Sequence, residues 1–276
     1  MGRRSSEGFQ GTGTSLKAII LCGGMGTRLR EQTEVKPKPM IEVGGYPLLL
    51  HIMRIYAHHG IRDFVLCLGY KGAVIKQYFL QIEALLGDFT LEFGAERKIH
   101  YHGMGARDLR DWRVTFVDTG ESTQTGERIL RASKYLNDET FAVTYGDGVA
   151  DIDLAAALAF HRSHGKLATV TGVRPPSRFG EIEAKDGEVL SFNEKPQVAQ
   201  GLINGGFFFF EPAFLKNIKQ VPHAALEREA LEKCVKDRQL QVYEHRGFWH
   251  CMDTYRDWQN LEEMWNSGAP PWRMWT

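Results

Sequence analysis

The sequence has no excess of either charge, no long apolar run and few cysteines. Lysine plus arginine and aspartate plus glutamate both number 34, so no overall field draws the chain toward nucleic acid or an anionic membrane. Because there is no stretch of about 18 apolar residues and no signal-peptide core near Met1, we expect a cytoplasmic protein. The four cysteines lack the spacing of a metal site or a disulfide framework, and we interpret them as reduced, mostly buried thiols.

Two common phosphate-binding motifs are also missing. A P-loop requires Gly-x-x-x-x-Gly-Lys-Ser/Thr, and the dinucleotide fingerprint requires Gly-x-Gly-x-x-Gly. Gly24-Met25-Gly26 begins like the fingerprint, but Leu29 stands where its third glycine should be. The strand expected at 63–68 also runs into Gly69-Tyr70 and not into the acidic residue that a dinucleotide enzyme needs. Both absences disfavour an oxidoreductase.

The length and composition suit one compact domain. With 276 residues, of which 43% are hydrophobic, the chain can bury roughly three quarters of its unfolded surface. Residues 1–15 are rich in glycine, serine and threonine, and we expect them to form a flexible N-terminal extension. We expect residues 16–276 to form a single domain without internal repeats.

Strand and helix patterns alternate along most of this domain. Such alternation predicts an α/β fold with a Rossmann-like, mainly parallel sheet sandwiched by helices, whose ligands lie at the carboxyl ends of the strands. After Pro175 the pattern changes, because two short strand patterns flank Asp186-Gly187 and predict a hairpin. The predicted strands are 16–21, 63–68, 113–117, 141–145, 167–173, 180–184 and 188–193, and the predicted helices are 47–59, 127–136 and 153–164.

Other conspicuous residues have ordinary explanations. His161 and His164 could bind a metal from one helix face, but no third ligand is visible, so we interpret them as helix-surface histidines. The run 207–210 is four phenylalanines and predicts a buried strand, and we expect Trp272 and Trp275 to pack against the protein or a neighbouring subunit.

Three glycines and two cations follow the first predicted strand. Gly23, Gly24 and Gly26 lack a Cβ, so successive N–H groups can turn toward one anion. Arg28 could fork onto the oxygens of a phosphate, and Lys38, held between two prolines on a stiff extended segment, could add a point charge. The pattern predicts a phosphate site, although the glycines alone also suit a plain strand-to-helix turn.

Asp147 is the second candidate for chemistry. It follows the strand predicted at 141–145 and lies between Gly146 and Gly148, so it should be accessible at the carboxyl edge of the sheet. An aspartate there can hold a metal ion, and it can equally form an Asp-Gly turn. The residues themselves leave both interpretations open.

Six motifs in order resemble those of the sugar-nucleotide pyrophosphorylases, also called nucleotidylyltransferases. The resemblance extends from about residue 16 to residue 276, and it implies a nucleotidyltransferase, glycosyltransferase-A-like fold with a small C-terminal β-rich part that binds sugar. The motifs are 23–29, 36–39, 145–148, 192–196, 203–207 and 249–254.

The resemblance also implies a role for individual residues. Arg28, Lys38 and Asp147 would be catalytic, with Arg28 on the leaving pyrophosphate and Lys38 on the α-phosphate. Asp147 and Asp253 would hold Mg²⁺, an ion that accepts one or two carboxylates and takes further ligands from phosphates. The implied nucleotide-binding residues are Leu21, Cys22, Gly23, Gly24, Met25, Gly26, Thr27, Arg28, Lys38, Thr123, Arg128 and Gly146, and the implied sugar-phosphate-binding residues are Gly180, Glu194, Lys195, Asn204 and Gly205.

Residues 117–128 and 269–272 are most similar to the cytidylyltransferase branch of this family. That branch implies transfer of CMP from CTP to α-D-glucose 1-phosphate, giving CDP-glucose and pyrophosphate. It also implies a homo-oligomer, with a hexamer as one arrangement, whereas the balanced charge predicts no nucleic-acid or membrane partner. The alternatives are a related enzyme that uses dTTP or UTP, and a non-catalytic nucleotide-sugar sensor. A sensor would be expected to lack Arg28, Lys38 or Asp147, and all three are present.

Overall fold

The computed structural model describes most of the expected domain. The described residues are 16–29, 33–94, 96–102, 109–175, 181–185, 188–193, 201–221 and 223–275. The predicted flexible extension, residues 1–15, lies outside them. Within these ranges, no helix is long and apolar enough to cross a membrane.

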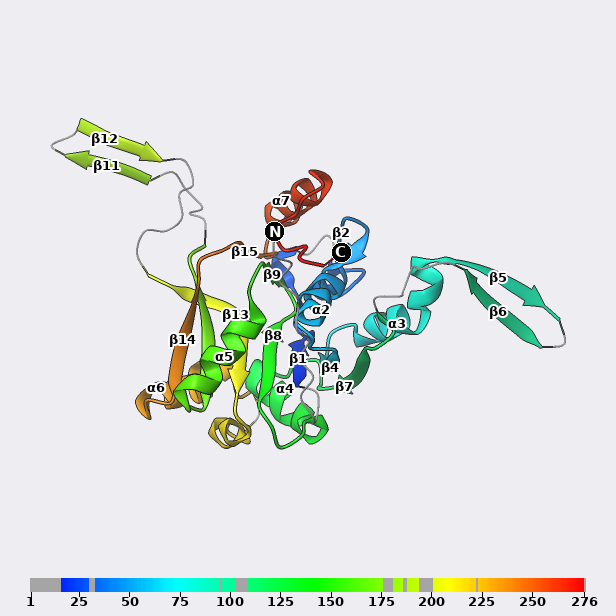
Figure 1. Ribbon diagram of the computed structural model, residues 1–276, viewed down its shortest axis with the longest axis horizontal. Coiled ribbons are helices and arrows are strands. Elements are labelled where there is room, and N and C mark those ends of the chain that lie inside the picture. The colour runs from blue at the N-terminus through cyan, green and yellow to red at the C-terminus, as the bar shows by residue number, and fades with distance from the viewer. Residues whose placement is uncertain are drawn as a thin grey trace, which may run out of the picture.

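A seven-stranded sheet runs through the centre of the molecule in the order β14-β10-β13-β8-β1-β4-β7 (Figure 1). Neighbouring strands are parallel except where β13 meets β8 and β10, so the predicted mainly parallel α/β fold is confirmed. The strands are β1 (Lys17–Leu21), β4 (Asp63–Leu68), β7 (Arg113–Asp118), β8 (Phe141–Tyr145), β10 (Ala168–Val173), β13 (Ile203–Phe210) and β14 (Leu240–His245).

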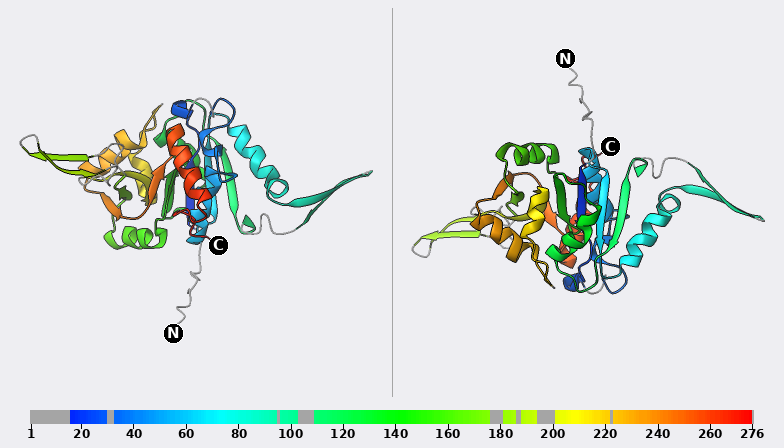
Figure 2. Two further views of the ribbon diagram at one scale, coloured as in Figure 1. Left: turned by 90° about the horizontal axis from the view of Figure 1, so that it is seen from above. Right: turned by 90° about the horizontal axis from the view of Figure 1, so that it is seen from below.

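Helices cover both faces of this sheet (Figure 2). Those packed on one face are α2 (Leu48–His58), α3 (Gly72–Leu86), α5 (Leu154–His164) and α7 (Tyr255–Asn266). Those on the other face are α4 (Thr125–Ala132), the π-helix η6 (Leu226–Leu231) and α6 (Glu232–Lys236). Short 3-10 helices are η1 (Thr27–Leu29), η2 (Lys38–Met40), η4 (Ser133–Tyr135) and η5 (Pro212–Asn217).

Strand residues alternate between two hydrophobic cores. In β13, Phe207 and Phe209 pack into the core beneath α2, whereas Phe208 and Phe210 pack into the core beneath α4 and α6. All four side chains are at most 2% exposed, so the predicted buried strand is confirmed. A strand buried on both faces reads as a continuous apolar run, which is why these phenylalanines are consecutive.

Four two-stranded sheets accompany the central one. β11 (Glu181–Lys185) and β12 (Glu188–Asn193) form the predicted hairpin, and β5 (Asp88–Phe93) pairs with β6 (Arg97–His102) in a hairpin that the sequence patterns missed. Both hairpins project from the body of the molecule (Figure 1). The other two pair β2 (Glu42–Val43) with β3 (Tyr46–Pro47), and β9 (Gly148–Ala150) with β15 (Trp249–Cys251).

One histidine prediction is wrong. His161 is buried and does not lie on the helix surface, because its Nδ1 lies 2.8 Å from Thr169 Oγ1 and its Nε2 lies 3.1 Å from Glu211 Oε1. His164 Nε2 shares the same Thr169 hydroxyl at 2.7 Å. A buried imidazole is stable here because both ring nitrogens have polar partners.

His51 and Trp272 anchor the C-terminal segment to α2. The buried Trp272 indole donates to His51 Nδ1 at 3.3 Å, and His51 Nε2 donates to the carbonyl of Val43 at 2.8 Å. Trp275 packs at the edge of the same aromatic cluster. The predicted packing of both tryptophans against the protein is therefore confirmed.

We expect His51 to make the stability of the protein depend on pH. Burial lowers the pKa of His51 to about 4, whereas a histidine in an unfolded chain has a pKa of about 6.5. The neutral ring therefore stabilises the fold fully above about pH 6.5, and this contribution is lost as the pH falls from there toward 4. Urea unfolding at a series of pH values measures this. As the pH is lowered from about 6.5 to about 4, the free energy of unfolding should fall less steeply in His51→Gln than in the wild type, and the two slopes should differ by up to about 1.4 kcal/mol per pH unit.

His100→Gln, on the exposed strand β6, is the control because it removes an imidazole that lies outside both hydrophobic cores. An unchanged slope in His51→Gln would contradict the expectation.

Candidate functional site

A cavity of about 330 Å³ opens at the carboxyl ends of β1 and β8. Most of the predicted nucleotide-binding residues line it, and Thr27 is among those that do not. Because β1 and β8 are parallel neighbours, the glycine loop after β1 and the Gly146 turn after β8 lie at the same edge of the sheet. The lining residues are Leu21, Cys22, Gly23, Gly24, Met25, Gly26, Lys38, Pro39, Glu121, Ser122, Thr123, Gln124, Thr125, Arg128, Tyr145, Gly146 and Asp147.

Backbone hydrogen bonds hold the glycine loop from both sides. Cys22 N–H donates to the carbonyl of Cys67 at 3.0 Å, and Gly146 N–H donates to the carbonyl of Leu21 at 3.1 Å. Gly26 has a φ of 59°, a left-handed conformation that favours glycine. A Cβ on Gly24 would meet no atom within 4 Å, so this part of the loop faces open space where a ligand can approach the backbone.

Arg128, from α4, ties the glycine loop to the segment 119–121. Its Nη1 donates to the carbonyls of Leu68 at 3.1 Å and Gly120 at 2.8 Å and to Thr119 Oγ1 at 2.7 Å. Its Nη2 donates to the carbonyls of Gly23 at 3.0 Å and Glu121 at 3.2 Å. These bonds occupy the guanidinium within the protein, so Arg128 shapes the cavity wall.

This contact requires glycine at position 23. A Cβ placed on Gly23 would lie 2.1 Å from Arg128 Nη1, and one on Gly69 would lie 2.6 Å from the same atom. The guanidinium of Arg128 thus fills the space that side chains at positions 23 and 69 would need. The sequence predicted close approach of a ligand at Gly23, and the structure shows that an arginine of the protein makes a close approach there.

Lys38 lies between two aspartates at the opening of the cavity. Its Nζ is 2.7 Å from Asp147 Oδ2 and 2.6 Å from Asp253 Oδ1. Burial disfavours the charged amine, but the charge of Asp147 and hydrogen bonds to both carboxylates outweigh this effect and raise the pKa of Lys38. The predicted extended conformation at Lys38 is wrong, because Lys38 is the first residue of the 3-10 helix η2 and the extended residue is Pro37 before it.

Arg28 lies outside the cavity and reaches the same cluster. Its side chain is 74% exposed, and its Nη1 is 3.1 Å from Asp253 Oδ2. Asp253 lies just before α7, where its N–H donates to the carboxylate of Asp257 at 3.1 Å, and Asp257 also forms a capping box with Thr254. The helix start therefore fixes the backbone at Asp253.

The aspartates fit a hard divalent cation. Ligand atoms of Asp147, Cys251 and Asp253 all lie within 4.8 Å of one another. Burial, with the charge of Asp147, raises the pKa of the Cys251 thiol, which keeps it protonated and a poor ligand. Two carboxylates with room for water and phosphate oxygens match the preference of Mg²⁺. Cys251 was not among the predicted site residues, although it stands two residues before Asp253 in the motif 249–254.

Asn204 and Gly205 follow Ile203 at the start of β13 and lie at this same edge of the sheet. Asn204 Nδ2 donates to the hydroxyl of Tyr145 at 3.2 Å, and the carbonyl of Gly205 accepts from Trp249 Nε1 at 2.7 Å. Tyr145 also donates to Glu227 Oε1. Gly180, Glu194 and Lys195, which the sequence analysis assigned to the sugar phosphate, lie outside the described residues.

Several polar residues of the site were not predicted from the sequence. Tyr145 could have been found, because it is the last residue of the strand that precedes Asp147. Glu227 has no local signal, since it reaches the site from the π-helix η6 and binds both Tyr145 and Thr125. Thr123 was predicted, but its neighbours Glu121, Ser122, Gln124 and Thr125 could be placed only once α4 was known to begin beside the glycine loop.

Comparison with known proteins agrees with this geometry. Residues 17–264 match the model of the nucleotidyl transferase family. The chain is 46% identical over 261 residues to glucose-1-phosphate cytidylyltransferase of Salmonella typhimurium, covering 94% of this chain and 100% of that protein. It is 33% identical to the mannose-1-phosphate guanylyltransferase catalytic subunit beta of Dictyostelium discoideum, covering 85% of this chain and 60% of that protein.

A solved structure of UDP-glucose pyrophosphorylase complexed with UDP-glucose shares the fold. Its TM-score is 0.67 at 15% identity, with 92% of this chain and 100% of that chain covered. The family match spans the glycine loop, Lys38 and both aspartates of the cation cluster. On these grounds the chain belongs to the nucleotidyl transferase family.

Proposed function

We propose that this protein transfers CMP from CTP to α-D-glucose 1-phosphate, giving CDP-glucose and pyrophosphate. The observation that carries the proposal is the 46% identity to a glucose-1-phosphate cytidylyltransferase over its entire length. The cavity supports it, because a glycine loop, a lysine and two aspartates meet at one edge of the sheet. These are the parts that a reaction between two polyanions needs.

The reaction requires neutralisation and alignment more than proton transfer. An oxygen of the sugar phosphate attacks the α-phosphorus in line, and pyrophosphate leaves from the opposite side. In our proposal Lys38 holds the α-phosphate and Arg28 the leaving pyrophosphate. Both cations pair with aspartates in the structure, so they can exchange a carboxylate for a phosphate oxygen without moving far.

We assign the cofactor Mg²⁺ to Asp147 and Asp253. When bound there, the ion would neutralise charge on the phosphates and help to align them. The carboxylates that now share Lys38 are accessible, with side chains 29% and 25% exposed. Binding of the cation would free Lys38 for the nucleotide.

The sugar side is proposed from the family resemblance and from β13. Asn204 and Glu194 would bind sugar hydroxyls, Gly180 and Gly205 would allow close approach of the sugar, and Lys195 would bind its phosphate. The hydrogen bond between Asn204 and Tyr145 supports the position of Asn204, since it connects β13 to the strand that carries the catalytic aspartate.

We also propose a cytoplasmic homo-oligomer, for which a hexamer is one arrangement. The four free cysteines suit a reducing compartment. An isolated two-stranded hairpin is marginal in water, yet β5 and β6 expose Phe89, Phe93, Ile99 and Tyr101. A second subunit would cover these side chains. Light scattering that finds only monomers would contradict the proposal.

The base preference is the first test of this function. We expect kcat/KM for CTP to exceed that for UTP and dTTP by roughly tenfold to a hundredfold, because a site built for the cytosine edge leaves buried groups unpaired when uracil enters. The measurement is pyrophosphate release at fixed glucose 1-phosphate and Mg²⁺. Equal values for CTP and UTP would remove the cytidylyltransferase assignment and leave the family assignment in place.

The aspartates give the second test. Asp147→Asn and Asp253→Asn should each lower kcat on the order of 10²- to 10⁴-fold, because they remove a carboxylate that holds the metal and positions Lys38. Asp88→Asn, on the exposed strand β5, is the control. Turnover is measured with added Mg²⁺, and thermal melts check folding. Wild-type turnover in either variant would contradict the metal assignment.

Arg128 gives the third test. Arg128→Lys keeps the charge but cannot donate to five oxygens, so the glycine loop should loosen and the KM for CTP should rise on the order of tenfold or more. The KM for glucose 1-phosphate should change little. Arg113→Lys is the control, because Arg113 begins β7 at the opposite edge of the sheet, where it pairs with Asp63. If Arg128→Lys binds CTP as the wild type does, the loop does not depend on this arginine.

A further inference from the structure

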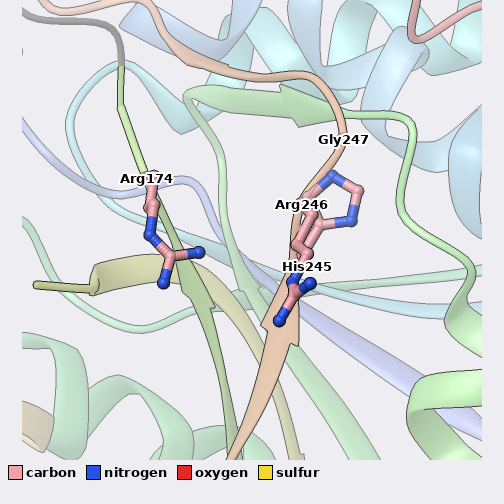
Figure 3. A pocket seen from close by; sticks show the side chains of 4 residues that line it. All are labelled: Arg174, His245, Arg246 and Gly247. Atoms are coloured by element: carbon pink, nitrogen blue, oxygen red, sulfur yellow. The ribbon is translucent and has the colours of Figure 1, made fainter. Parts of the chain in front are cut away.

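A second cavity, of about 320 Å³, opens at the carboxyl ends of β10 and β14. These strands are parallel neighbours, and Val173 of β10 stands opposite His245 of β14. Arg174 and Arg246, each the first residue after its strand, therefore lie side by side. Figure 3 shows the side chains of Arg174, His245 and Arg246 around this opening, and Gly247 completes the lining.

The two arginines carry a net positive charge that is open to solvent. Arg174 Nη1 forms an ion pair with Glu244 Oε1, and Arg246 Nε lies 3.4 Å from the same oxygen. The two guanidinium groups thus converge on one anionic oxygen, and together with Glu244 they keep one net positive charge. Their side chains are 34% and 79% exposed, so an anion from solvent can reach them.

The backbone that presents Arg246 is held firmly. His245 is nearly buried, and its Nε2 lies 3.0 Å from both the carbonyl of Phe248 and Asp151 Oδ1. A Cβ on Gly247 would lie 2.3 Å from Asp151 Oδ1, so only glycine fits at position 247. Asp151 N–H also donates to the carbonyl of Phe248 at 3.2 Å. The arginine therefore extends from a fixed turn.

This cavity adjoins the sugar side of the candidate site. In the sheet, β13 with Asn204 and Gly205 separates β8 from β10. Three residues after Arg246, Trp249 donates its indole N–H to the carbonyl of Gly205 at 2.7 Å. The same stretch of chain continues to Asp253 in the cation cluster. An anion at Arg246 would thus lie on a segment that contacts both the proposed sugar site and the proposed metal site.

We propose that Arg174 and Arg246 form a second anion site, which takes a phosphate monoester next to the bound sugar. Guanidinium groups match phosphate bidentately, and a dianion can compete with the single charge of Glu244 for them. Nothing in the proposed transfer of CMP uses these arginines. The location beside the sugar rests on the proposed function, whereas the anion site itself does not.

Direct binding tests the site. Isothermal titration calorimetry would use inorganic phosphate and glucose 6-phosphate as probes, with and without α,β-methylene-CTP and glucose 1-phosphate to fill the reaction centre. We expect Arg174→Gln/Arg246→Gln to weaken binding of both probes at least about tenfold, since two charge-assisted contacts are lost. Arg62→Gln/Arg162→Gln removes the same charge from exposed positions and is the matched control.

Kinetics then distinguish two sources of the phosphate. If it belongs to a free effector, glucose 6-phosphate should change the KM for glucose 1-phosphate in the wild type and not in the double variant. If it belongs to the acceptor, glucose 1,6-bisphosphate should be used with a higher kcat/KM than glucose 1-phosphate, and the double variant should lose that advantage. Either result supports the site.

The double variant should turn over glucose 1-phosphate alone as the wild type does, with an unchanged thermal melt. Affinity for the probes that is equal in the wild type and the double variant, or no binding at millimolar concentrations, would overturn the proposal. A failure of the proposed function would look different: no turnover of CTP, with binding of the probes still dependent on the two arginines.

Discussion

Two aspartates that lie far apart in the sequence, Asp147 and Asp253, share one lysine, and the arrangement of the candidate site depends on this contact. Carboxylates about 5 Å apart repel each other by about 3–4 kcal/mol at an effective dielectric constant of about 20. Lys38, with one nitrogen within 2.7 Å of both, offsets that repulsion. Without a cation the fold would favour keeping Asp147 and Asp253 apart. The lysine thus preserves, in the free protein, the spacing that a metal ion needs.

Arg128 is also a cation, but it holds the backbone of the glycine loop in place. It is 4% exposed and donates mainly to backbone carbonyls. These acceptors carry only partial negative charges. A guanidinium suits this position because its planar fork can satisfy several oxygens at once. A lysine suits the aspartate cluster because it can turn from carboxylate to phosphate. The site therefore uses arginine where the structure must stay fixed and lysine where the contact must change.

The sequence predicted the parts of the site that lie next to strands. The glycine loop follows β1 and Asp147 follows β8, and hydrophobic runs placed both strands correctly. Lys38 could be singled out because prolines flank it. Asp253 carries no such local signal and was found only through the family resemblance.

Contacts made by backbone atoms or by distant side chains could not be predicted in this way. The partners of Arg128 include the carbonyls of Leu68 and Gly23, and carbonyls are present in every residue of any sequence. His161 looked like a surface residue because its partner Glu211 is 50 positions away. The hairpin of β5 and β6 was missed because its side chains are exposed on both faces, so no alternating burial pattern marks it.

The single reversed strand, β13, has a consequence for how such a protein can change. Because β13 runs against β10, the chain leaves β10 and enters β13 at one and the same edge of the sheet. Both ends of the segment between them, residues 174–202, therefore lie at the edge of the sheet where the proposed sugar site is. Insertions, deletions or replacements in that segment leave every strand pairing of the sheet intact. The acceptor specificity of the fold can thus diverge while the strands that carry the glycine loop and Asp147 stay as they are.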